Sequence, residues 1–381
     1  MVRLFFFIPL WPIFALFADI SAIYLSWSED PTTTMTIQWH TPLEDVDTVH
    51  LLIPENLSVT GTHYTFANEP LVVHTVKLKD LLPNTEYQFR IGQFEKKYRF
   101  RTAPEQLERP LRFVVGGDLY LSPSLFRKMS GVVLKQDPLF VVLGGDLAYA
   151  IGHPHPFSSK PLTQWRHFLA DWTQHLQTPN GRLIPFLLVP GNHDLSSKET
   201  GLFFALFDFP EKILYRTVDF GQYLSLVLLD TAHLSPIAGA QTQWLEKALS
   251  VRSDVSYLFA IYHVGAYPSF YEYEGKDPKS IRANWCPLFD RYNVQACFEH
   301  HSHAYKKTFP LKGNQKASPG TIYFGDGCWG VKPRITHKAW YLEKSASINH
   351  VYLIEMTATE ARVNAISIQE KLIDRAIIPA R

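Results

Sequence analysis

The sequence predicts two fold classes in succession, an all-β sandwich and then a layered α/β domain. Three observations support this prediction. Short runs of alternating or apolar residues recur at even spacing over residues 20–102, the apolar runs become continuous after Pro110, and stretches of helical periodicity lie between several of the later runs. Evenly spaced short strands are typical of β sandwiches, whereas strands that alternate with helices are typical of α/β layers.

Composition and charge narrow the class of protein. Hydrophobic residues make up 46% of the 381 residues, so the chain can bury a large core and wholesale disorder is excluded. Lys and Arg total 37 against 36 Asp and Glu, a balance that argues against a general nucleic-acid binder. Cys286, Cys297 and Cys328 are too few and too dispersed for a disulfide scaffold or a structural zinc site, and their odd number leaves at least one thiol unpaired within the chain.

Residues 1–18 have the layout of a secretory signal peptide. Arg3 precedes the apolar run from Leu4 to Phe17, and Ala18 fits the last position before a cleavage site. We expect a secreted or periplasmic mature chain, with an uncleaved anchor as the alternative. No other run approaches the roughly 18–20 apolar residues of a membrane helix, so no membrane span is expected in the mature chain.

Residues 19–103 are predicted to form the β sandwich. The predicted strands lie in IYLSWS, TMTIQWH, VHLLI, VVHTVKL, EYQFRIG and KKYRFRT. The stretch Leu81–Gly92 resembles the tyrosine-bearing turn and strand of fibronectin type III domains. Pro104 and Pro110 then mark a linker.

Residues 110–381 are predicted to form the α/β domain. LRFVVGGD, LFVVLGGD, IPFLLVPGNHD, YLSLVLLD, LFAIYHV and VQACFEHHSH contain continuous apolar runs, which fit strands buried on both faces. Helices are expected from Ser122-Pro123 onward, over residues 162–176 and around 244–249, and HVYLIEMT and EARVNAIS are expected to be closing strands. A site in such a sheet lies at the carboxyl ends of its strands.

Polar segments follow these predicted strands in a fixed order. They are Gly117-Asp118, Gly145–Tyr149, Gly191–Asp194, His263 and His301–His303. One such segment alone is often only a turn, but five in order, each after a strand, indicate a shared site. Carboxylate, amide and imidazole donors without thiolates suit ions such as Zn²⁺, Fe and Mn.

This ordered set resembles the calcineurin-like metallophosphoesterases and, among them, the purple acid phosphatases. The resemblance implies a layered αββα domain preceded by a fibronectin type III-like sandwich. It also implies a two-metal site with these roles: Asp118, Tyr149 and His303 on the first metal, Asp146 as the bridge, Asn192, His263 and His301 on the second metal, and His193 as the acid that faces the substrate phosphate.

The implied chemistry is hydrolysis of phosphate monoesters by direct attack of a metal-bound hydroxide. Two adjacent cations repel each other, so they need an anionic bridge such as Asp146. The resemblance implies Fe(III) beside Tyr149 and Fe(II), Zn or Mn at the second position. His301 and His303 are expected to point to the same side of an extended segment. We expect the protein to bind a phosphorylated small molecule and not to bind nucleic acid. Whether it forms a homo-oligomer is left open.

The sequence departs from the family pattern mildly at Ala260–His263, where the family commonly has Val-x-x-His, and more clearly in two further places. His300 stands where the family commonly has glycine before the paired histidines, and Tyr271 and Tyr273 occupy the region where plant-type members carry a histidine pair. His300 is either a further site residue or a neighbour of the ligands. Four other polar residues are expected to serve turns or to orient the ligand loops: Asp194, Asp230, His233 and Asp326.

Two alternatives to a phosphomonoesterase are a phosphodiesterase or nucleotide hydrolase on the same scaffold, and an inactive protein that binds through its β module. The seven ligand positions are all intact, which argues against the inactive protein. Of the 16 histidines, four support the site and His300 is undecided. The other eleven are expected to be ordinary surface or core residues.

Overall fold

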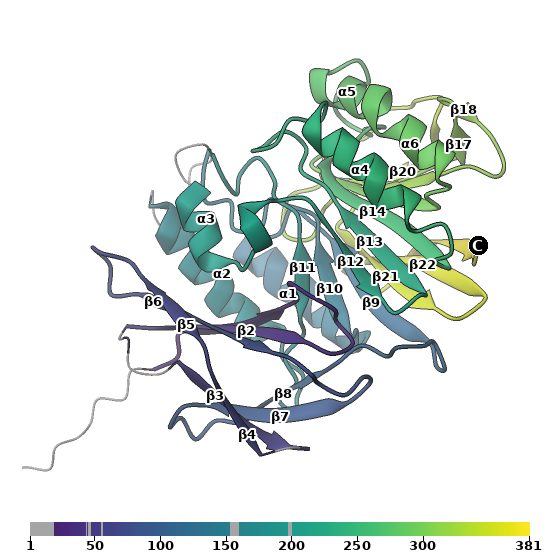
Figure 1. Cartoon of the computed structure of the whole chain (residues 1–381). Helices are drawn as coiled ribbons and strands as arrows, with labels where there is room; N and C mark the ends of the chain where they lie inside the picture. The colour runs from purple at the N-terminus through teal and green to yellow at the C-terminus, as the bar shows by residue number, and fades with distance from the viewer. Residues whose placement is uncertain (1–18, 43, 45–46, 55, 153–159, 197–199) are drawn as a thin grey trace, which may run out of the picture.

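The computed structural model describes residues 19–381 except residues 43, 45–46, 55, 153–159 and 197–199 (Figure 1). The predicted signal peptide, residues 1–18, lies outside the described residues. Among the residues that are described, no helix is long and apolar enough to cross a membrane.

The first domain is a sandwich of two antiparallel four-stranded sheets, which confirms the all-β prediction. One sheet has the order β1 (Ala22–Ser26), β2 (Met35–Thr41), β6 (Val72–Leu78) and β5 (Thr62–Thr65). The other has the order β4 (Leu57–Thr60), β3 (Thr48–Ile53), β7 (Glu86–Ile91) and β8 (Tyr98–Arg101). The Tyr87 hydroxyl accepts a hydrogen bond of 2.7 Å from the backbone N–H of Leu82 and so fixes the turn before β7.

The second domain contains two mixed sheets. One has the order β11 (Phe186–Leu188), β10 (Phe140–Leu143), β9 (Leu111–Gly116), β21 (His350–Met356), β22 (Glu360–Ser367) and β23 (Leu372–Pro379). The other has the order β12 (Arg216–Phe220), β13 (Leu224–Leu228), β14 (Tyr257–Val264), β15 (Ala296–His300), β19 (Ile322–Gly325), β16 (Tyr305–Thr308) and β20 (Leu342–Ala346). A small hairpin, β17 (Leu311–Lys312) and β18 (Gln315–Lys316), lies beside it.

Helices cover the outer faces of both sheets, on opposite sides of the domain (Figure 1). The first sheet is covered by α1 (Pro123–Lys135), α2 (Pro161–His175) and α3 (Thr200–Leu206). The second is covered by α4 (Ala240–Ser250), α5 (Lys276–Asn284) and α6 (Cys286–Arg291). The sequence patterns predicted α1, α2 and α4 but not the others; α3 and α6 are too short for a clear helical period.

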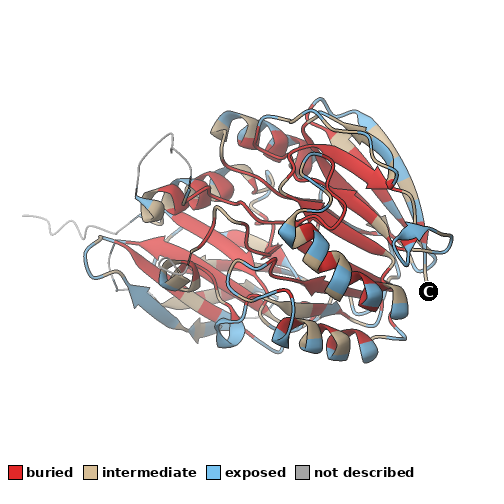
Figure 2. Ribbon diagram, turned by 90° about the horizontal axis from the view of Figure 1, so that it is seen from above, coloured by how far each residue is buried: buried red, intermediate tan, exposed pale blue. Residues whose placement is uncertain are grey.

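The two sheets pack face to face through apolar side chains, which completes the αββα layers. Phe140 of β10 stacks on Phe220 of β12 with ring centroids 4.7 Å apart. Figure 2 shows the strands at the centre of the sheets largely buried, whereas several edge strands and the outer faces of the helices are exposed. β14 is buried along its whole length, whereas all four residues of β5 are exposed. The sandwich rests on α2, where the N–H of Ile23 donates to the Thr173 hydroxyl at 2.8 Å. This packing aligns parallel strands of both sheets, so their carboxyl ends form one edge.

The three cysteines are buried free thiols. Burial raises the pKa of the Cys286 thiol to about 12. A neutral, inaccessible thiol is inert, so these residues act as small apolar groups of the core.

Candidate metal centre

The predicted site residues meet at the common edge formed by the carboxyl ends of the parallel strands. In chain order they are Asp118 after β9, Asp146 and Tyr149 after β10, Asn192 and His193 after β11, His263 within β14, and His301 and His303 after β15. Five separate segments therefore contribute donors to one place, as expected for an α/β site.

The backbone is left-handed at five of these residues, which is uncommon for residues other than glycine. Such a conformation costs on the order of 1–3 kcal/mol per residue and is concentrated at functional sites. The φ angles are 58° at Asp118, 51° at Asp146, 53° at Tyr149, 74° at His301 and 56° at His303. The prediction that His301 and His303 lie in an extended segment is therefore wrong, because a turn follows β15 and sends the two side chains into different groups of donors.

Asp118, Tyr149 and His303 form the first group. The Tyr149 hydroxyl lies 3.3 Å from Oδ1 of Asp118 and 3.2 Å from Nε2 of His303. Nε2 of His303 is also 2.9 Å from Oδ1 of Asp118. All three side chains are buried, so a phenol, a carboxylate and an imidazole converge away from bulk water.

Asp146, Asn192, His263 and His301 form the second group. Nε2 of His263 lies 3.1 Å from the Asn192 amide oxygen and 3.4 Å from Oδ1 of Asp146. The other ring nitrogen of His263 donates to the Gly144 carbonyl at 2.8 Å, which directs Nε2 into the group. The imidazole of His301 packs edge-on against that of His263, with ring centroids 5.0 Å apart.

Asp146 belongs to both groups. Its donor atoms lie within 4.8 Å of those of His263 and His301 on one side and of those of Asp118 and His303 on the other. Oδ2 of Asp146 is buried and has no hydrogen-bond partner among the described residues. A buried carboxylate oxygen without a partner is costly, and a cation would satisfy it. The residues present therefore fit a pair of cations with Asp146 between them.

Burial and negative charge hold the Tyr149 phenol neutral in the absence of a cation. Burial, followed by the charges of Asp118 and Asp146, raises the pKa of Tyr149 well above its ordinary value. Burial and the nearby Asp146 charge likewise raise the pKa of Asp194 to about 8. The site thus concentrates carboxylates that repel one another, and a bound cation would relieve that repulsion.

Asp194 ties two of the ligand-bearing loops together. One carboxylate oxygen accepts from the N–H of Leu147 at 2.7 Å and the other from the N–H of Gly191 at 2.8 Å. Gly191 also permits close approach, because a Cβ there would come within 2.2 Å of the Asp146 backbone nitrogen. The loops after β10 and β11 are therefore held in one arrangement.

His193 lies beside the metal-binding groups and is in neither of them. Its N–H donates to Oδ1 of Asp146 at 2.8 Å, and its ring stacks on Tyr149 with centroids 5.0 Å apart. Nδ1 lies 2.9 Å from the carbonyl oxygen of Ile151, which can only accept, so Nδ1 carries the proton. The neutral imidazole is therefore the Nδ1–H tautomer, with its lone pair on Nε2.

The His300 imidazole packs behind the loops that carry the predicted ligands. A Cβ on Gly144 would come within 1.9 Å of the His300 ring, and one on Gly117 within 2.5 Å, so the glycines make room for this imidazole. Nδ1 of His300 lies 3.0 Å from the Tyr262 carbonyl, and burial lowers the pKa of His300 to about 4. His300 is therefore a neutral packing residue behind the ligand loops.

The remaining predicted polar residues serve turns and neighbouring loops. Asp230 accepts the backbone N–H groups of His233, Leu234 and Ser235. The His233 ring lies 5.7 Å from that of His263, and burial lowers the pKa of His233 to about 3. Asp326 accepts from the N–H of Ser269 at 2.9 Å, and its own carbonyl accepts from the N–H of His303 at 2.9 Å.

Tyr271 reaches the site, whereas Tyr273 does not. The Tyr271 ring stacks on His301 with centroids 4.5 Å apart, and its hydroxyl accepts from Arg334 at 2.6 Å. Arg334 also lies 3.4 Å from the His301 carbonyl oxygen. Tyr273 instead contacts Arg282, 3.4 Å from its ring centroid. Arg334 was not predicted from the sequence, because it lies outside the motifs, in the loop between β19 and β20.

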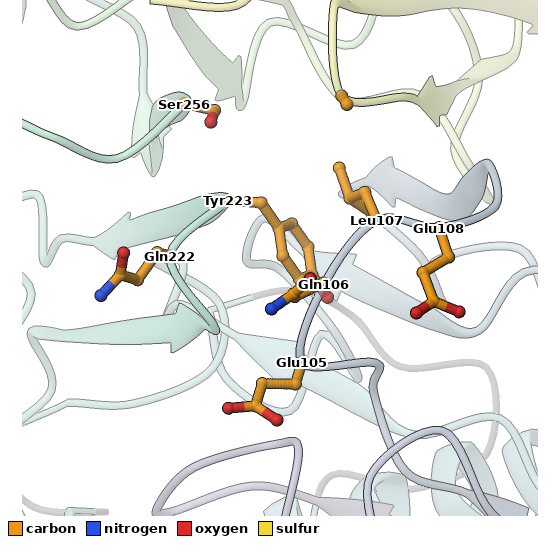
Figure 3. A pocket seen from close by; sticks show the side chains of 8 residues that line it. Glu105, Gln106, Leu107, Glu108, Gln222, Tyr223 and Ser256 are labelled. Carbon is orange, nitrogen blue, oxygen red and sulfur yellow. The ribbon is translucent and has the colours of Figure 1, made fainter.

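Two hollows lie at opposite ends of the parallel strands, one beside the site and one away from it. A cavity of about 330 Å³ adjoins the site and is lined by Tyr271, His301 and Ser302 among others. Another of about 320 Å³, shown in Figure 3, is lined by Glu105, Leu107, Gln222, Tyr223 and Ser256 among others. Gln222 and Ser256 precede β13 and β14, so this second hollow lies at the amino ends of the strands, at the linker.

Comparisons with protein families match both domains. The model of the purple acid phosphatase N-terminal domain matches residues 20–102, and that of the calcineurin-like phosphoesterases matches residues 111–305. Purple acid phosphatase 21 of Arabidopsis thaliana is 26% identical over 291 residues, 70% of this chain and 61% of that protein. The "Probable inactive purple acid phosphatase 27" of the same plant is 24% identical over 298 residues, 65% of this chain and 46% of that protein. The chain thus spans less than two thirds of the length of these relatives.

Solved structures share the fold. The purple acid phosphatase PPD1 from yellow lupin (Lupinus luteus) seeds matches with a TM-score of 0.78 at 17% identity, over 94% of this chain and 74% of that one. PhoD matches with a TM-score of 0.68 at 12% identity, over 97% of this chain and 90% of that one. With both domains matched and the two donor groups assembled at the strand ends, the chain belongs to the purple acid phosphatase-like proteins of the calcineurin-like metallophosphoesterase superfamily.

Proposed function

We propose that this metallophosphoesterase hydrolyses phosphate monoesters at a two-metal centre. The observation that carries the proposal is Asp146, which is shared by two groups of donors and has a buried oxygen without a partner. The proposed ligands are Asp118, Tyr149 and His303 on one ion, Asn192, His263 and His301 on the other, and Asp146 on both.

The bound cations would supply positive charge that holds the phosphate and lowers the pKa of an attacking water. The other tasks fall to side chains of this chain. Asp146 keeps the cations adjacent, and Asp194 holds the loops that carry the ligands. His193, with its proton fixed on Nδ1 by Ile151, protonates the leaving oxygen through Nε2 when doubly protonated. Arg334 and Tyr271 lie beside His301, where they can orient a phosphate ester.

Iron(III) is the proposed ion beside Tyr149, with Fe(II), Zn or Mn at the second position. The pKa of Tyr149 is raised well above its ordinary value by burial and by Asp118, so this phenol ionises only when a strongly charged cation replaces its proton. Phenolate, carboxylate and imidazole together suit a hard, highly charged ion.

The relatives include purple acid phosphatases named as inactive, so activity itself is part of the proposal. The test is to load the purified chain with iron and zinc or manganese and to compare aryl phosphate with bis-aryl phosphate. We expect about two metals per chain and faster turnover of the monoester. Faster turnover of the diester would favour a phosphodiesterase. A chain that stays inactive after loading with each metal pair would overturn the enzymatic proposal.

The Tyr149→Phe variant tests the position of the iron. A ferric–tyrosinate band in the visible spectrum of the wild-type chain is expected to vanish in this variant and to persist in the control Tyr273→Phe, whose hydroxyl contacts Asn314 instead. A band that survives in Tyr149→Phe would contradict the assignment.

We also infer that residues 1–18 direct export to a secreted or periplasmic location, because Arg3 precedes a long apolar run that ends at Ala18. The first residues of the mature chain, read by mass spectrometry after expression in its own host, test this. A chain retained in the cytoplasm with Met1 intact would contradict it.

A further inference from the structure

The β sandwich contains another cluster of side chains that can bind a metal. It is far in the sequence from the proposed catalytic edge, which is the edge of the second domain where the two donor groups lie. His63 on the edge strand β5 lies directly opposite His74 on β6, and Asp47 immediately precedes β3 in the other sheet. Nδ1 of His63 is 2.6 Å from Oδ2 of Asp47, and Nδ1 of His74 is 2.6 Å from Oδ1. The two imidazoles thus face the same carboxylate, and the three donor atoms lie within 4.8 Å of one another.

The outer nitrogen of the His74 imidazole has a hydrogen-bond partner, as is typical of metal-binding histidines, and that of His63 faces a carboxylate. Nε2 of His74 lies 2.7 Å from the Thr41 hydroxyl, and the His74 ring stacks on Trp39 with centroids 5.0 Å apart and planes 8° apart. Nε2 of His63 faces the Glu44 carboxylate at 3.9 Å. Hydrogen-bond partners at the far nitrogen fix ring orientation and tautomer in metal sites.

We propose that Asp47, His63 and His74 form a zinc site in the β sandwich. Two imidazoles and one carboxylate are a donor set that zinc accepts, with a water as the fourth ligand. Zinc binds the Nδ1 lone pairs, so each zinc-bound imidazole carries its one proton on Nε2: a neutral ring that held its proton on Nδ1 changes tautomer, and a doubly protonated ring releases its Nδ1 proton to solvent. At His74 the Nε2–H then donates to the Thr41 hydroxyl.

A cation here links the two sheets of the sandwich. His63 and His74 belong to the first sheet, whereas Asp47 adjoins β3 of the second, and the Asp47 carbonyl accepts from the N–H of Gly61 beside β5 at 2.8 Å. β5 is an edge strand, and a cation at this position would fix it to the second sheet through Asp47. The site is therefore a structural one and does not depend on the proposed phosphatase activity.

The experiment measures zinc bound per full-length chain after chelation, reloading with zinc and dialysis. It compares the wild-type chain with His63→Ala and Asp47→Asn, and with His50→Ala as the matched control. His50 is a histidine of the same domain that pairs with Ser58 outside the cluster. The series is repeated on an Asp146→Ala background, which lacks the shared residue of the catalytic centre. Circular dichroism verifies that each variant is folded.

We expect His63→Ala and Asp47→Asn to bind one zinc fewer than the wild-type chain, and His50→Ala to match it. The Asp146→Ala chain should retain one zinc, and His63→Ala on that background should bind none. Zinc should also raise the midpoint of thermal unfolding of the Asp146→Ala chain but not of its His63→Ala derivative. Equal zinc content with and without His63, or an Asp146→Ala chain that holds no zinc, would overturn the proposal. Neither outcome depends on hydrolysis of any phosphate ester.

Discussion

The proposed catalytic edge and the cluster in the β sandwich share carboxylate and imidazole donors but differ in backbone conformation. At the catalytic edge five of seven proposed ligands have positive φ, and all but His263, which lies within β14, come from loops after parallel strands. In the sandwich none of Asp47, His63 and His74 has positive φ, and the two histidines are simply a cross-strand pair. The proposed two-ion centre collects seven donors from five segments, and turns with left-handed residues bring them together. In the sandwich, strand pairing alone aligns two of the three donors, and the loop before β3 adds Asp47.

The two clusters also differ in average burial. Asp146 is 1% exposed and His263 is fully buried, whereas in the sandwich only His74 is buried and His63 lies on an exposed strand. Desolvation makes an unpaired charge far more costly at the catalytic edge than at the sandwich surface. Substitutions at the catalytic edge should therefore have larger effects than those in the sandwich.

The largest effect is expected for Asp146→Ala. Among the described residues, Asp146 alone belongs to both donor groups, so metal content at the catalytic edge should fall at both positions and aryl phosphate turnover should be lost. The measurement is elemental analysis of iron and zinc alongside the turnover rate. A variant that keeps one tightly bound catalytic metal and substantial turnover would show that Asp146 is no bridge.

These residues also show how much the sequence could predict. The catalytic segments were identifiable because each follows a continuous apolar run, and their fixed order distinguishes them from ordinary turns. Their geometry was less predictable. His301 and His303 suggested an extended segment, but the left-handed turn after β15 depends on tertiary contacts, such as the hydrogen bond from His303 to the Asp326 carbonyl.

The sandwich cluster of Asp47, His63 and His74 does not follow continuous apolar runs in the sequence, so no motif indicated it. His63 lies in β5, a strand of four exposed residues whose composition did not mark it, and Asp47 is 16 residues away in a loop. Only the pairing register of β5 with β6 brings His63 opposite His74. For the same reason Arg334 was missed: its contact with Tyr271 depends on how two loops meet above the sheet and not on any periodicity.

The next largest effect is expected for His193→Ala. This change should lower the turnover rate without lowering the metal content. His193 donates its backbone N–H to Asp146 but contributes no ring nitrogen to either group. Metal content should stay near the wild-type value, while turnover falls by roughly 10²–10⁴-fold through loss of the acid. Esters with a good leaving group should be less affected, since they need no proton. Loss of metal from this variant would contradict the assigned role.

A smaller effect is expected for Arg334→Gln. The guanidinium contacts the Tyr271 hydroxyl and lies near the His301 carbonyl, so its loss should weaken substrate phosphate binding without changing metal content. Hydrogen bonds to charged groups contribute about 1.5–3 kcal/mol, so KM should rise roughly 10- to 100-fold with kcat less affected. Arg334→Lys should restore part of this affinity. An unchanged KM in Arg334→Gln would place the phosphate elsewhere.

The smallest effect is expected for Thr41→Val in the β sandwich. The change removes the hydroxyl that holds Nε2 of His74 at 2.7 Å while keeping the shape of the side chain, and such supporting partners contribute roughly 10-fold to metal affinity. Zinc affinity of the sandwich should therefore fall about 10-fold, measured by competition with a chelator on the Asp146→Ala chain. Phosphatase turnover of the single variant should match the wild-type rate, because Thr41 belongs to the other domain. If Thr41→Val instead lowers turnover and leaves zinc affinity unchanged, the sandwich acts on the catalytic edge directly and the two clusters are not independent.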